Sequence, residues 1–219
     1  MDILPKWQDF MDNSRSLVEF FYNIVPGALF IFLLQYFGVY GIDAFNIHKD
    51  ATVVIFVFLV LALFLGFLFQ GIVVIFRHLV WNKKSFKEVE ADNPVFNLVL
   101  KTFGKKVIEP RDDYKYLFYL MDDKLRVDNS AFLPTHFSSL FAFWSNIFCA
   151  CSLLLIVIFI HELCTPSFDS KKVDVLILIV FLASISWYFA DKFLKSFYDT
   201  ILNCYYMKFI KKENGRIDL

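Results

Sequence analysis

The sequence predicts an all-α integral membrane protein with four transmembrane helices. A helical cytoplasmic insertion is expected between spans two and three, and a cytoplasmic helical extension after span four. Hydrophobic residues make up 58% of the 219 residues, against about 45–50% in a typical soluble domain. Four apolar runs approach or exceed the roughly 20 residues that a helix needs to cross the hydrocarbon core. The basic residues lie almost entirely on one side of these runs.

The four apolar runs carry no charged side chain. They cover residues 20–42, 52–76, 139–160 and 175–190. The fourth run is short, but it reaches spanning length when it is continued to Lys195, because the long stem of a lysine lets its ammonium group reach the headgroups. The runs therefore predict two transmembrane hairpins, at residues 16–80 and 139–195.

The orientation of the spans follows from the lysines and arginines. Only Lys49 lies between runs one and two, and only Lys171 and Lys172 lie between runs three and four. All other basic residues precede the first run, lie between runs two and three, or follow the fourth. Because basic loops stay on the cytoplasmic side, both termini are predicted to be cytoplasmic.

The segment before the first run, residues 1–15, has the pattern of an amphipathic helix lying in the cytoplasmic interface. Its apolar side chains recur at helical spacing, at Ile3, Leu4, Trp7, Phe10 and Met11. A disordered start is the alternative. Ser16 and Glu19 stand three residues apart ahead of the apolar run, which predicts a capping box at the start of the first transmembrane helix.

The cytoplasmic segment 81–138 is expected to hold two short amphipathic helices. Asn93 and Pro94 can open the first helix, and Gly104 can stop it. The second helix is expected to begin at Asp112 or at Asp113. Since helices this short do not persist alone, they must pack on each other, on the membrane helices or on another chain.

The C-terminal extension, residues 196–219, is expected to continue the fourth span as one helix to Lys212, because neither Pro nor Gly interrupts it. Asp191, Lys195 and Asp199 stand four residues apart, which predicts ion pairs along its surface. The alternative is an elbow near Asp199 that lays the end of the helix on the membrane, where its last lysines would meet anionic headgroups.

Polar residues in or beside the apolar runs are candidates for a functional role. They are Asn23, Pro26, Arg77, Asn146 and Asp191. Pro26 frees a backbone carbonyl near residue 22, which Asn23 can satisfy unless it bonds to another helix. The kink at Pro26 is either a packing feature or a gating hinge. Arg77 and Asp191 both end apolar runs at the cytoplasmic boundary, and they are predicted to pair unless each reaches interfacial water.

A faint repeat relates the first and third runs. Residues 16–24 match residues 139–147 at several positions, which places Asn23 and Asn146 at equal depth in the membrane. A chance match in a sequence of such biased composition is the alternative.

No converging set of catalytic groups is visible, so no enzyme activity, cofactor or metal site is predicted. The sequence has no HExxH, G-x-S-x-G, P-loop or dinucleotide-binding pattern. His161, Glu162 and Cys164 offer possible metal ligands on the outer face, but a plain interfacial loop is the simpler interpretation, and the role of His161 and Cys164 stays open. The four cysteines are expected to be free thiols. Direct nucleic-acid binding is not expected, because segment 81–138 has no basic stripe.

The arrangement of spans over residues 16–212 resembles that of small four-span membrane subunits of bacterial anti-phage systems. Asn-Ile-Val-Pro-Gly at 23–27 and Phe-Trp-Ser-Asn at 143–146 belong to this resemblance. Examples of such subunits are the membrane component of Kiwa and the accessory membrane proteins beside some RNA-targeting CRISPR effectors. The resemblance implies a protein that senses or disturbs the membrane and works with a soluble partner.

Two functions are expected from this plan. The first is a non-catalytic scaffold or sensor, homo-oligomeric and in contact with membrane lipids, that recruits a cytosolic partner. The partner is expected on apolar stripes of the cytoplasmic regions, which two short helices cannot hide completely. The stripe residues proposed to bind it are Leu117, Phe118, Met121, Phe197, Ile201 and Tyr205. The alternative function is an oligomeric pore that depolarises the membrane.

Overall fold

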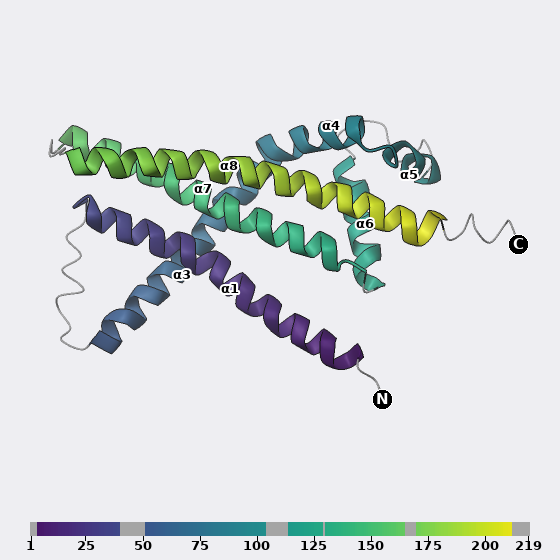
Figure 1. The fold of residues 1–219 in the computed structure, drawn as a ribbon, viewed down its shortest axis with the longest axis horizontal. Coiled ribbons are helices and arrows are strands. Elements are labelled where there is room, and N and C mark those ends of the chain that lie inside the picture. Colours follow the sequence, from purple (N-terminus) through teal and green to yellow (C-terminus); the bar gives the residue numbers. More distant parts are fainter. Residues whose placement is uncertain (1–3, 40–50, 104–113, 129, 165–169, 212–219) are drawn as a thin grey trace, which may run out of the picture. The chain divides into compact units, whose positions relative to one another are not determined.

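The computed structural model describes residues 4–39, 51–103, 114–128, 130–164 and 170–211 (Figure 1). Regular structure within these ranges is helical throughout. The helices are α1 (Leu4–Tyr36), α3 (Ala51–Phe76), α4 (Asn82–Asp92), α5 (Phe96–Phe103), α6 (Tyr114–Val127), α7 (Phe132–Cys164) and α8 (Ser170–Tyr205). Two π-helical segments, η1 (Arg77–Trp81) and η4 (Tyr206–Ile210), continue α3 and α8.

The chain divides into two compact units. Unit 1 comprises Met1–Val74 and Ala142–Tyr188, and unit 2 comprises Ile75–Phe141 and Phe189–Leu219. Unit 1 therefore holds α1 and most of α3, together with the apolar parts of α7 and α8. Unit 2 holds the short helices and the ends of the long ones.

Three helices are long and apolar enough to cross a membrane. They are Ala51–Trp81, Phe132–Cys164 and Ser170–Ile210. This confirms the second, third and fourth apolar runs as helices of spanning length. The apolar part of α1, Phe20–Tyr36, is shorter than these three.

Helix α1 differs from the prediction at both ends. It begins at Leu4 and runs through Ser16 and Glu19 without a break, so the predicted helix start at Ser16 is wrong. It ends at Tyr36, before the predicted end of the first run, because Gly38 takes a left-handed conformation with φ of 70°. The amide of Gly38 donates to the carbonyl of Gln35 at 3.0 Å, and the amide of Val39 donates to the carbonyl of Leu34 at 3.2 Å. This pair of hydrogen bonds is a Schellman ending.

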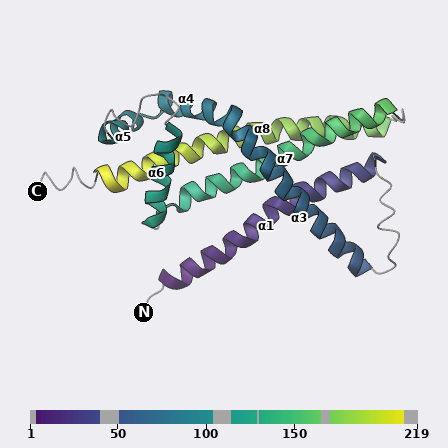
Figure 2. The same cartoon turned by 180° about the vertical axis from the view of Figure 1, so that it is seen from behind.

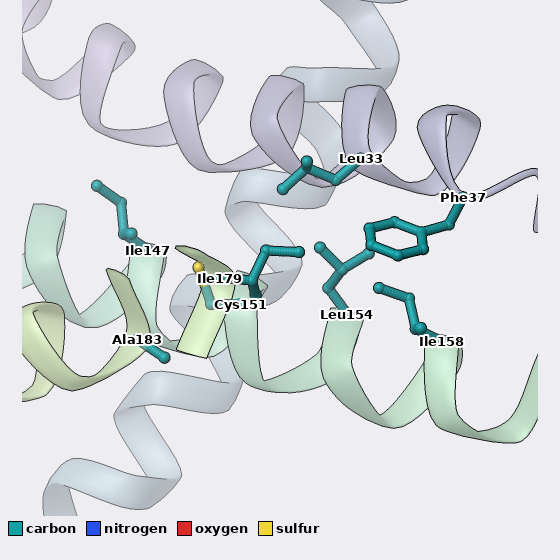
Figure 3. Packing of buried hydrophobic residues seen from close by; sticks show 8 residues of the cluster. All are labelled: Leu33, Phe37, Ile147, Cys151, Leu154, Ile158, Ile179 and Ala183. Carbon is teal, nitrogen blue, oxygen red and sulfur yellow. The ribbon is translucent and has the colours of Figure 1, made fainter. Parts of the chain in front are cut away.

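The core of unit 1 joins three helices. Side chains from α1, α7 and α8 interdigitate there (Figure 3), namely Leu33, Phe37, Ile147, Cys151, Leu154, Ile158, Ile179 and Ala183. Cys149 and Cys151 are buried free thiols, as the sequence predicts for cysteines inside an apolar run.

Helices α1 and α3 cross at glycines (Figures 1 and 2). A Cβ atom on Gly27 would lie 1.8 Å from the carbonyl oxygen of Ala62, and one on Gly66 would lie 2.0 Å from the carbonyl oxygen of Asn23. Both distances are far too short for a real contact, so the two backbones touch only because neither position has a side chain. Ala62 and Gly66 form a small-xxx-small pattern of the kind that brings membrane helices together.

Unit 2 folds the short helices against the end of α8. Rings from α4, α6 and α8 form a triangle of Phe86, Phe118 and Tyr198, with centroids 4.5 to 5.2 Å apart. Helix α4 was not predicted, because charged residues dominate its sequence and leave only Ser85 and Val89 fully buried on its inner face. Helix α5 follows Pro94, as predicted, and Asp112 and Asp113 lie outside the described residues.

Polar contacts fasten α4 to α8. Lys195 pairs with Asp92 at 2.7 Å and with Glu88 at 3.9 Å, and Asn93 Nδ2 donates to Asp199 Oδ1 at 3.0 Å. The sequence predicts ion pairs of Lys195 and Asp199 along α8, and it does not predict these contacts with α4. The alternative elbow near Asp199 is wrong, because α8 is continuous from Ser170 to Tyr205.

Candidate functional site

The six residues predicted to bind a partner are buried in unit 2. Their exposed fractions are 1% for Leu117, 2% for Phe118, 0% for Met121, 7% for Phe197, 1% for Ile201 and 7% for Tyr205. The two stripes are core residues of unit 2, so the prediction that they are exposed is wrong. A partner of the folded unit has to bind to other residues.

The outward face of α6 remains apolar although its inward face is fully covered. Tyr116, Leu120 and Val127 are 58%, 38% and 87% exposed. Leu120 follows Tyr116 by four residues, and Val127 follows Leu120 by seven, so that all three lie on one side of the helix. We call these three residues the outward face of α6. Sequence reasoning singled out only the inward stripe of this helix and missed these three residues, because charged residues interrupt them along the chain.

Three basic side chains of α6 and η4 are engaged within unit 2. Arg126 Nε donates to Asp122 Oδ2 at 2.8 Å. The ammonium group of Lys124 lies 4.4 Å from the centre of the Phe209 ring. The ammonium group of Lys208 contacts the Asp128 carboxylate and donates to the Ser130 hydroxyl at the junction of α6 and α7.

Arg77 lies in an aromatic cage at the start of the π-helical segment η1. Its guanidinium carbon is 5.3 Å from the ring centre of Phe141 and 5.7 Å from that of Phe197, distances at which a cation is attracted to a ring face. Arg77 Nη2 also donates to the hydroxyl of Tyr198 at 3.5 Å. The predicted ion pair with Asp191 is not among these contacts.

A small cavity of about 10 Å³ lies beside this cage. Residues of η1, α4, α6 and α8 line it, namely Arg77, Phe86, Phe118, Tyr119, Asp122, Phe197, Tyr198 and Ile201. Its walls are mostly aromatic, and its two charged residues, Arg77 and Asp122, have opposite signs.

A second polar centre lies inside unit 1. Asn146 Nδ2 of α7 is 3.5 Å from the carbonyl oxygen of Tyr22 and 3.5 Å from Asn23 Oδ1, both in α1. The contact agrees with the equal depth that the repeat predicts for the two asparagines. Ser186 of α8 is also fully buried, and sequence reasoning missed it because a single serine in an apolar run carries no pattern.

Metal-ligating side chains do not gather at either polar centre within the described part of the chain. Among the described residues, no group of three or more His, Cys, Asp or Glu side chains is placed to hold a metal ion. Glu162 forms an ion pair with Lys172 at 3.8 Å, and its carboxylate lies 3.8 Å from Nδ1 of His161. Comparison with protein-family models, with curated proteins and with solved structures found no match to this chain.

Proposed function

We propose that this protein is a non-catalytic, multi-pass membrane scaffold that docks a cytosolic protein on the outward face of α6. The observation that carries the proposal is the exposure of three large side chains on the side of α6 away from the core. One side of α6 forms the core of unit 2, and the other exposes Tyr116, Leu120 and Val127 beside the charged Asp123. Exposed apolar side chains that gather on one helix face mark an interaction site.

The proposed topology has four spans with both termini and unit 2 in the cytoplasm of a bacterium. Two features support α1 as a transmembrane helix in addition to the three long apolar helices. Its apolar part, Phe20–Tyr36, carries no charged residue. It also packs through Gly27 directly on Ala62, in the apolar middle of α3, where lipid would surround any helix beside it. The distribution of basic residues supports the orientation.

A protein suits the outward face of α6 better than an anionic membrane does. Binding to anionic headgroups depends on free lysines and arginines, and Lys124, Arg126 and Lys208 are each held by partners inside unit 2. The exposed tyrosine of this face favours a protein as well, because tyrosine is enriched in protein interfaces. Anti-phage defence, which the arrangement of spans implies, is the setting in which we propose to look for this partner.

Purification of the full-length protein from its host in mild detergent tests the docking. A soluble protein is expected to co-purify, and the double variant Tyr116→Glu with Leu120→Glu is expected to release it. Leu98→Glu, on an exposed position of α5, is the matched control and should retain the partner. Retention of the partner by the double variant would contradict docking on α6.

An oligomeric pore is the second candidate. It is favoured by α3, whose apolar window is only 17% buried within the chain, so that other copies have room to pack against it. Purified protein reconstituted in liposomes separates the two candidates. A scaffold leaves a dye-loaded liposome intact, whereas a pore releases the dye without any partner.

A further inference from the structure

We infer that a single water molecule is bound between Arg77 and Asp122 and joins the end of α3 to α6. Arg77 Nε and Asp122 Oδ1 are both buried without a hydrogen-bond partner, and both residues line the same cavity. Folded proteins leave very few buried polar atoms unpaired. A donor and an acceptor that share one cavity therefore point to a common ligand. This inference is independent of the proposed docking.

One further polar atom of each side chain already has a partner. Arg77 Nη2 donates to the Tyr198 hydroxyl, and Asp122 Oδ2 accepts from Arg126 Nε at 2.8 Å. The N–H at Arg77 Nε is thus left as a donor and Asp122 Oδ1 as an acceptor. Water suits this pair, because one water molecule can accept a hydrogen bond from Arg77 Nε and donate one to Asp122 Oδ1 at the same time.

The size and charge of the cavity select water over other ligands. A volume of about 10 Å³ is close to the minimum for one water molecule and excludes larger molecules. An anion would meet the Asp122 carboxylate, and a cation would meet the Arg77 guanidinium. The aromatic walls of Phe86, Phe118 and Phe197 offer no competing hydrogen bonds.

Nuclear magnetic resonance of the full-length protein, labelled with ¹⁵N-arginine in detergent micelles, tests the site. The Nε–H signal of Arg77 is identified by its loss in Arg77→Lys. We expect this proton to exchange slowly with solvent and to show a cross-peak to a long-lived water. Absence of the cross-peak in the wild-type protein overturns the proposal.

Variants of Asp122 test whether the water reaches α6. Asp122→Asn keeps an oxygen acceptor and should keep the cross-peak, whereas Asp122→Leu removes the acceptor and should lose it. Arg126→Gln is the control, because Arg126 bonds to the other carboxylate oxygen, and it should leave the cross-peak in place. Circular dichroism checks that each variant is folded. A cross-peak that persists unchanged in folded Asp122→Leu shows that the water does not bridge the two residues and overturns the inference.

Discussion

The side-chain amide of Asn146 donates to the backbone carbonyl of Tyr22, across the contact of α7 with α1. This carbonyl stands four residues before Pro26, which has no N–H to give it. The amide of Asn146 therefore takes the place of the missing helical hydrogen bond. The same amide lies 3.5 Å from Asn23 Oδ1, so it serves two acceptors of α1 at once.

The first prediction is that Asn146 and Pro26 are energetically coupled. Asn146→Ala removes the hydrogen bond to this carbonyl and should lower the free energy of unfolding by about 1 kcal/mol. In a Pro26→Ala background the same change should cost less, because the new N–H of residue 26 can bond to the Tyr22 carbonyl. Unfolding in mixed detergent micelles measures all four proteins of this double-mutant cycle.

Ser145→Ala is the control for this cycle. Ser145 is as deeply buried as its neighbour, but its hydroxyl donates within its own helix, to the carbonyl of Ala142. The stability lost in Ser145→Ala should therefore be the same whether or not Pro26 is present. Equal losses for Asn146→Ala in both backgrounds would mean that the amide does not replace the bond that Pro26 removes.

The second prediction concerns the glycines at the crossing of α1 and α3. Gly66→Ala places a methyl group against the backbone of Asn23, and it should destabilise the protein by about 1–3 kcal/mol or more, as overpacking does. Gly71→Ala is the matched control in the same helix, because nothing lies within 4 Å of its added Cβ. The control should be neutral or stabilising by up to about 1 kcal/mol, from the higher helix propensity of alanine. The melting temperature in detergent compares them, and equal behaviour of the two variants would contradict the close crossing.

The third prediction tests the orientation of the chain with its own cysteines. Cys164 is exposed at the end of α7, whereas Cys149 and Cys151 are buried. A membrane-impermeant maleimide should label Cys164 in intact cells, and permeabilisation should add only Cys204. Cys164→Ser should abolish the label in intact cells. Labelling of Cys204 before permeabilisation would place the C-terminal end on the outer side and reverse the proposed topology.

The long helices could be predicted from the sequence because the apolar composition of each run is enough to identify them. The apolar runs that became α3, α7 and α8 need no partner to be recognised. The repeat predicted equal depth for Asn23 and Asn146, but it did not predict their contact. The end of α1 was missed because a single glycine, Gly38, stops the helix inside an apolar run, where hydropathy continues past it.

The side-chain partners were harder to predict, because they depend on how helices distant in sequence pack. The stripes of α6 and α8 were recognised as apolar, but nothing local shows that Phe118 and Tyr198 cover each other. Arg77 was expected to pair with Asp191 on α8, and the aromatic rings beside it were not predicted. Arg77 stands in a π-helical turn, and helical periodicity does not predict such a turn.

The last prediction compares two double variants, one in the core between α6 and α8 and one on the outward face of α6. The first should unfold unit 2, and the second should only release the partner. Phe197→Asp with Ile201→Asp introduces two carboxylates into the core of unit 2, where both side chains are buried. Loss of their packing alone should lower the free energy of unfolding by at least about 5 kcal/mol. Hydrogen exchange should then show α6 and the end of α8 unprotected, so this variant loses any partner by unfolding.

The matched variant changes the outward face of α6 instead. Tyr116→Asp with Leu120→Asp alters only exposed side chains, so its effect on stability should stay below about 1 kcal/mol. Hydrogen exchange should remain as in the wild-type protein while the partner is lost. The opposite result would be that α6 stays protected from hydrogen exchange in the core variant and loses this protection in the outward variant. The two faces would then be assigned the wrong way round. The docking surface would have to be sought among the residues that form the core in this structure.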